Sequence, residues 1–119
     1  MIQKVSIDMQ LPFSYVDEEL VHQLTYLAPF GKGNSQPIFA QKEVEILGHR
    51  ITGKNRNVML MDVRDESGTV LSAVIFGDVE AFRTYFMSKP NRKVAITYYP
   101  RINDYLGGNE LQLVIQNYQ

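Results

Sequence analysis

The strongest constraint on this chain is a change in the spacing of its apolar residues near position 43. Before that point apolar residues recur at helical spacing; after it they alternate with polar residues, which is typical of half-buried strands. Helical spacing returns at residues 78–86, where Val79, Phe82 and Phe86 are three and four positions apart. The pattern predicts strands at 43–51, 57–65 and 69–76, a helix at 78–86, and strands at 93–100 and 110–118.

The first 35 residues predict a strand and a helix that lead into this pattern. Residues 5–8 are the expected strand. Ser14 is the expected helix N-cap, followed by Asp17 and Glu18 in the first turn, where negative charge suits the helix dipole. The apolar stripe of this helix consists of Leu20, Val21, Leu24, Leu27 and Ala28. Pro29 is expected to end the helix, because the residue before a proline disfavours helical geometry.

Three strands, a helix and two further strands follow one another in the order of an OB-fold, the five-stranded, partly open Greek-key barrel. We therefore predict a mainly β structure with some α: an OB-fold barrel with a helix between its third and fourth strands. The turn between the second and third strands contains Gly68, which can adopt positive φ. One domain is expected over residues 1–119, with the lead-in at 1–35 and the barrel at 36–119.

Two loops flank the ligand face of an OB-fold, and here they are expected at residues 48–57 and 100–110. Single-stranded nucleic acid needs cations along its phosphates and aromatic faces for its bases. The phosphate candidates are Arg50, Lys54, Arg56, Lys93 and Arg101. The stacking candidates are Tyr98, Tyr99 and Tyr105. Tyr98 and Tyr99 point to opposite faces of a strand, so at most one of them lies on the binding face, and we select Tyr99 together with Tyr105.

Composition narrows the class of protein. The net charge is −1, so the whole chain is not a basic nucleic-acid binder, although its bases gather in two stretches without acids, 48–58 and 81–103. From charge alone, a mixed solvated surface is favoured over a single positive face as the explanation of this distribution. The absence of cysteine and the lack of an apolar span or a secretory signal lead us to expect a cytoplasmic protein without membrane contact.

The glycine-rich stretch PFGKGN, residues 29–34, resembles a phosphate-binding loop only superficially. A Walker-type loop needs Ser or Thr directly after its lysine and a helix next, whereas Gly33 follows Lys32 and a strand is expected next. Glycine and asparagine after a helix accept left-handed backbone geometry and end it. The stretch is therefore interpreted as a structural turn.

The same stretch carries a family resemblance. LAPFGKGNSQPIFA is similar to the L-x-PFG-x-GNP-x-P-x-F signature of RecJ, the single-strand-specific 5′ to 3′ exonuclease of bacteria, except that Ser35 stands where the family usually has proline. VSIDMQL, LSAVIFG and INDYLGGNELQLVIQNY resemble further segments of the same OB domain in the same order. The resemblance spans nearly the whole chain and implies the C-terminal OB domain of a RecJ-like nuclease.

The resemblance also implies where catalysis takes place. RecJ hydrolysis is attributed to DHH-type domains that hold manganese or magnesium, and this chain has no Asp-His-His run. We therefore expect no cofactor in this fragment and no enzyme activity of its own. His22 is expected on the helix surface and His49 in the first loop. Asp62, Asp65 and Glu66 are interpreted as a charged, solvated turn rather than a metal site.

Several functions remain compatible with the sequence. The first is an accessory domain that binds single-stranded DNA and delivers it to the catalytic domains of the parent nuclease, in DNA repair and recombination. The second is a scaffold that docks on those domains through its acidic helix and closes the DNA channel, with little DNA affinity of its own. The near-neutral charge favours the second. An RNA-binding OB module is a third and weaker alternative, because the fold does not distinguish DNA from RNA.

Overall fold

The computed structural model describes residues 7–25, 37–103 and 108–119. The PFGKGN stretch and Tyr105 lie outside these residues, so their expected roles stay predictions. Two α-helices and six strands make up the described part, together with short 3-10 turns at Phe13–Tyr15 and Pro90–Arg92. The strands are β1 (Ile7–Gln10), β2 (Ile38–Thr52), β3 (Val58–Arg64), β4 (Val70–Phe76), β5 (Lys93–Asn103) and β6 (Glu110–Tyr118); the helices are α1 (Glu18–Thr25) and α2 (Val79–Met87).

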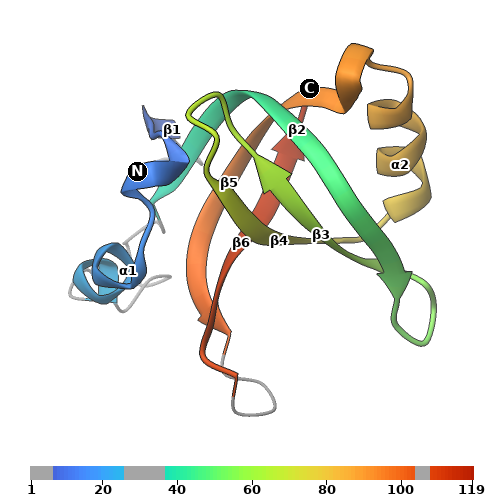
Figure 1. Cartoon of the computed structure of the whole chain (residues 1–119). Helices are drawn as coiled ribbons and strands as arrows, with labels where there is room; N and C mark the ends of the chain where they lie inside the picture. The colour runs from blue at the N-terminus through green and yellow to red at the C-terminus, as the bar shows by residue number, and fades with distance from the viewer. Residues whose placement is uncertain (1–6, 26–36, 104–107) are drawn as a thin grey trace, which may run out of the picture.

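Five of the strands close into a barrel (Figure 1). β2 pairs with β3 and β5, β3 pairs with β4, and β6 joins β4 to β5, with every contact antiparallel except β4–β6. β1 adds to the outside of this ring, parallel to the start of β2. The predicted OB-fold is confirmed, including the helix between the third and fourth barrel strands.

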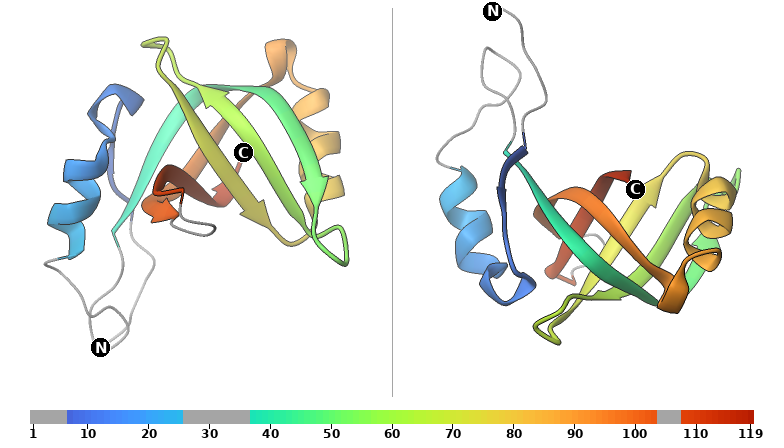
Figure 2. Two further views of the ribbon diagram at one scale, coloured as in Figure 1. Left: turned by 60° about the horizontal axis from the view of Figure 1, so that its bottom comes forward. Right: turned by 90° about the horizontal axis from the view of Figure 1, so that it is seen from above.

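Aromatic side chains seal the barrel at two places. α2 buries Val79, Phe82 and Phe86 against the strands, as its helical spacing predicts. Burying each phenyl group contributes roughly 2 kcal/mol relative to leaving it in water. On the other side of the barrel, Phe13 packs its ring against Tyr98 at 5.8 Å. Figure 2 shows α2 and the N-terminal elements on opposite sides of the ring.

Tyr98 belongs to the core. Its side chain is fully buried, and its hydroxyl donates a hydrogen bond to the Leu11 carbonyl at 3.3 Å. Burial raises the pKa of Tyr98 above its usual range, and the negative charge of Asp65 adds to this effect. The hydroxyl therefore stays protonated and keeps its role as a donor that holds the N-terminal segment on the barrel.

The N-terminal segment differs from its prediction in two ways. Ser14 lies in the 3-10 turn, and the cap of α1 is Asp17, whose Oδ1 accepts from the Leu20 backbone N–H at 2.9 Å. The predicted N-cap was wrong because Ser14 and Asp17 both suit that position. The 3-10 turn at Phe13–Tyr15 places the helix start after Asp17. β1 extends to Gln10, two residues beyond the expected strand end at Asp8. Residues 5–6 of the expected strand and the predicted helix end at residues 27–29 lie outside the described residues.

Asp65 is also placed differently from its prediction. It is 5% exposed rather than solvated, and its Oδ2 accepts the Phe13 backbone N–H at 2.7 Å. Its Oδ1 accepts from the hydroxyl and the backbone N–H of Ser67, at 2.6 and 3.1 Å. The β3–β4 turn, in which Gly68 has the expected positive φ, is thereby tied to the N-terminal segment.

β2 and β5 are both longer than predicted. β2 begins at Ile38, and a bulge between Gln41 and Val44 resets its alternation, with Glu43 at a φ of 57°. β5 continues through Pro100 to Asn103, because this part pairs with β6 while the pairing with β2 covers Lys93 to Tyr98. Neither described helix is long and apolar enough to cross a membrane.

Candidate nucleic-acid interface

The outer face of the second and third barrel strands, here β3 and β4, binds ligands in OB-folds, and β6 pairs beside β4. Strand register places Asp62, Ser72, Gln112 and Arg101 in one row across β3, β4, β6 and β5. A groove of about 310 Å³ lies on this face. Its lining includes Arg50, Leu60, Asp62, Ser72, Glu110 and Gln112.

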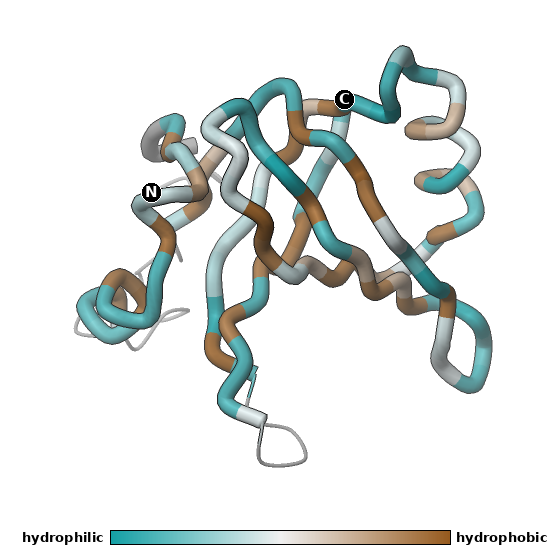
Figure 3. Tube along the Cα trace, viewed as in Figure 1, coloured by the Kyte–Doolittle hydropathy of each residue, from teal (hydrophilic) through white to brown (hydrophobic). Residues whose placement is uncertain are grey.

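The β2–β3 turn stands at one edge of this face. It covers residues 53–57, shorter than expected because β2 runs to Thr52, and Figure 3 shows it mostly in hydrophilic colours. Gly53 has a φ of 95°, and its carbonyl accepts the Arg56 N–H at 3.1 Å. The Asn57 carbonyl accepts the N–H of Gly77 at 2.9 Å, which fixes the turn beside the end of β4. Lys54 is exposed in this turn.

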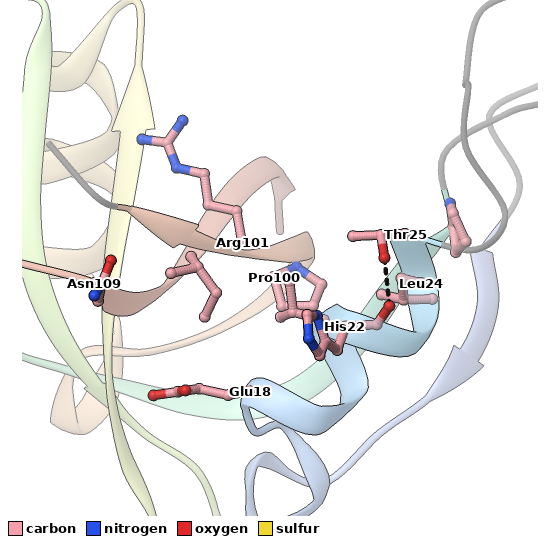
Figure 4. Close-up of a pocket in the computed structure, with 10 residues that line it drawn as sticks. Glu18, His22, Leu24, Thr25, Pro100, Arg101 and Asn109 are labelled. Atoms are coloured by element: carbon pink, nitrogen blue, oxygen red, sulfur yellow. Dashed lines mark hydrogen bonds between the residues drawn. The ribbon is translucent and has the colours of Figure 1, made fainter.

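Arg101 is held in a defined position on this face. Its Nε and Nη2 both donate to Oε1 of Gln112, at 3.0 and 2.8 Å, and Gln112 is only 3% exposed. The centre of the Arg101 guanidinium lies 5.9 Å from the ring centroid of Phe76 on β4. The side chain therefore crosses from β5 over β6 toward β4, and Figure 4 shows its guanidinium pointing away from α1.

The structure places two of the five predicted cations at the groove and a third in the turn that follows β2. Arg50 lines the groove from β2, Arg101 reaches it from β5, and Lys54 lies in the adjoining turn. Arg56 in the same turn forms an exposed ion pair with Glu80 of α2 at 3.8 Å. Lys93 is the first residue of β5 and pairs with Glu45 of β2. It lies eight residues before Arg101, a separation of roughly 26 Å along the strand. Lys93 is therefore apart from the others.

The predicted tyrosines separate in the same way. Tyr98 is in the core, whereas Tyr99 is half-buried and pairs in register with Val114 on the outward side of the barrel. Phe76 was not singled out from the sequence, although 53% of its surface is exposed at the end of β4. An aromatic residue at the end of a hydrophobic strand is expected in the core, and only the strand register shows that Phe76 points outward.

Acidic side chains share the groove with the cations. Asp62 is exposed on β3, and Glu110 accepts a hydrogen bond from the Ser72 hydroxyl at 2.9 Å. Two acids thus oppose Arg50 and Arg101, and the centre of the face is close to neutral. Asp62 lies on β3 opposite Ser72, within the strand predicted at 57–65.

A second and larger cavity lies between α1 and β5 (Figure 4). It encloses about 590 Å³, with apolar walls from Val21, Leu24, Pro100 and Ile102. Glu18 and His22 of α1 also line it. No residue in the described span of α1 is buried, so this helix rests on the barrel through partial contacts.

A family model described as the RecJ OB domain matches residues 7–117, nearly all of the chain. The chain belongs to the RecJ OB-domain family. The resemblance inferred from the PFG-x-GN stretch and the closing hairpin is thereby confirmed. A comparison with curated proteins found no match.

A RecJ OB domain is an accessory rather than a catalytic part of its parent. Within residues 7–25, 37–103 and 108–119, no group of three or more His, Asp or Glu is placed to hold a metal ion. His22 is exposed on α1, as predicted. His49 does not lie in the loop as expected: it is on β2, where its ring contacts the edge of Phe86 at 5.1 Å.

Proposed function

We propose that this RecJ OB domain binds single-stranded DNA for the catalytic domains of a RecJ-like 5′ to 3′ exonuclease, in DNA repair and recombination in the bacterial cytoplasm. The observation that carries the proposal is the placement of Arg50, Lys54 and Arg101 around one polar groove on the OB ligand face. Cations at this spacing can follow a phosphate backbone without reading sequence. The metal ions for hydrolysis belong to the catalytic domains in this proposal.

The alternative is a scaffold that docks on the catalytic domains and closes their DNA channel. The cavity between α1 and β5 favours it, because that cavity has apolar walls and α1 buries none of its described residues. Acidic residues Glu18 and Glu19 open the same helix. Arg101 lines this cavity and also donates hydrogen bonds to Gln112 of the groove, so the two surfaces meet at Arg101.

The deciding experiment is a titration of the chain with fluorescent oligothymidine at rising salt. The informative variant is Arg50→Gln with Lys54→Gln. The matched control, Lys42→Gln with Lys93→Gln, makes the same charge change at exposed positions away from the groove. Loss of two phosphate contacts reduces the slope of log K against log salt by about 1.4.

Weaker binding and a shallower slope for the groove variant alone would support DNA binding at this face. Equal loss of affinity in both variants would show that DNA binds at another surface or by diffuse charge attraction. Absence of binding by the wild-type chain at low salt would leave the scaffold function, which is then tested by association with the separate catalytic domains.

A further inference from the structure

Resting on single-stranded DNA binding at this face, we propose that Phe76 and Arg101 form one nucleotide subsite. In this subsite a nucleobase stacks on the exposed ring of Phe76, and its phosphate accepts hydrogen bonds from the guanidinium of Arg101. The subsite adds to the predicted tyrosines an aromatic residue that only the structure reveals.

Phe76 is placed as a stacking surface. It ends β4 on the outer face, opposite Val58 of β3, and exposes 53% of its surface. Ile75, the residue before it, points inward and is 7% exposed. The Gly77–Asn57 hydrogen bond directly after Phe76 joins this position to the turn that carries Lys54. An exposed aromatic ring beside a cationic turn accepts any base, because every base has a π-face.

Arg101 supplies the second half of the subsite. A guanidinium has five N–H donors, and two of those on Arg101 are occupied by Oε1 of the buried Gln112. Three donors remain for an anion. The hydrogen bonds to Gln112 orient the guanidinium before any ligand arrives, so less side-chain entropy is lost on binding. Its position 5.9 Å from the Phe76 ring places cation and aromatic face within reach of the same nucleotide.

The near-neutral charge of the groove explains why a stacking residue matters here. Asp62 and Glu110 offset the attraction of Arg50 and Arg101 for phosphates. Charge attraction alone then gives modest affinity for DNA. Base stacking on Phe76 adds binding free energy that salt does not screen. Arg101 beside Phe76 and Lys54 in the β2–β3 turn provide cations for the flanking backbone.

A single tryptophan tests the subsite directly, because the chain contains none. In Phe76→Trp, oligothymidine is expected to quench the new fluorescence as a base stacks on the indole. The matched control is Val70→Trp, which starts the same strand on the same face with 47% exposure. Six residues, roughly 20 Å, separate the two positions, so the control is expected to keep its fluorescence.

Affinity provides a second readout. Phe76→Ala is expected to weaken oligothymidine binding by about 5- to 150-fold, the range for losing one base-stacking contact. Tyr15→Ala removes another exposed aromatic, on the N-terminal turn, and is expected to bind like the wild type.

The possible results separate the subsite from the proposed function. Wild-type binding that depends on Arg50 and Lys54, with no quenching at position 76 and no loss in Phe76→Ala, overturns the subsite and leaves DNA binding intact. A wild-type chain that binds no oligothymidine overturns both. Quenching confined to position 76 together with weaker binding of Phe76→Ala supports the subsite.

Discussion

Asp62 is one of the two carboxylates that oppose the cations of the groove. It is exposed on β3 beside Ser72, on the face where phosphates are proposed to lie. Asp62→Asn removes this repulsion and is expected to tighten oligothymidine binding about two- to fivefold at low salt, with a smaller gain at high salt. Fluorescence titration at two salt concentrations measures the change.

The control for this charge effect is Glu66→Gln. Glu66 is exposed in the β3–β4 turn, off the groove, and its removal changes the net charge by the same amount. Equal gains in both variants would mean that total charge, rather than the charge of this face, governs binding.

Asp65 makes folding stability depend on pH. Burial pushes the pKa of Asp65 upward, but hydrogen bonds from the Ser67 hydroxyl and from the N–H groups of Phe13 and Ser67 outweigh it and hold the pKa below its ordinary value. Protons therefore bind the unfolded chain more readily. The stabilisation is complete above the unfolded pKa, near 4, and is lost as the pH falls through the lower folded pKa.

Urea unfolding between pH 7 and pH 3 tests this effect. Asp65→Asn is expected to lower the free energy of unfolding by about 1–3 kcal/mol at pH 7, because Phe13 and Ser67 lose a charged acceptor. The difference between wild type and variant should shrink toward pH 3. A difference that stays constant over this range would show that the charge of Asp65 is not responsible.

At the scale of elements, the order and type of the barrel segments followed from periodicity, since α2 and β6 each show one clear repeat. The bounds of β2 could not be predicted from periodicity. Its bulge places a non-glycine residue, Glu43, at positive φ, and glutamate gives no local signal for that geometry. Pro100 likewise suggested a strand end, although β5 passes through it where β6 is the pairing partner.

The loops of the site were predictable for the same reason as the barrel, because element order alone locates them. The groove on the ligand face could not be predicted from element order. Whether Asp62, Gln112 and Phe76 lie on one solvent-facing side depends on the pairing of the β3–β4 hairpin with β6, which is distant in sequence. Arg101 was identified as a cation, but its fixation by Gln112 required the register of β5 against β6.

The bulge in β2 yields a prediction at this scale. Glu43→Gly removes the side-chain penalty of positive φ and is expected to raise the free energy of unfolding by about 0.5–1 kcal/mol, whereas Glu43→Val should lower it by about 1–2 kcal/mol. Urea midpoints at unchanged m-value measure both. Lys42→Gly, next door at negative φ, should be destabilising by about 1 kcal/mol. Stabilisation by both glycine substitutions would refute a special conformation at Glu43.

For the whole molecule, the number of cations that meet phosphates determines how strongly salt weakens binding. Three cations, Arg50, Lys54 and Arg101, are placed to meet phosphates, so log K is expected to fall with log salt at a slope of about −2. The oligothymidine titration gives this slope directly. A slope of about −4 or steeper would bring further cations, Lys93 among them, into the interface.

Closure of the ring determines when the domain can fold. β6 is the last strand, and it pairs with both β4 and β5, so the barrel stays open until synthesis has passed Tyr118. Until then β4 and β5 each present an unpaired edge, which invites association with other nascent chains. Contacts as distant as Phe39 with Tyr98 must also form in the same step, which slows folding relative to a helical domain of this length. The closed barrel therefore folds late and as one unit. A chain truncated within β6 would remain an open, aggregation-prone sheet.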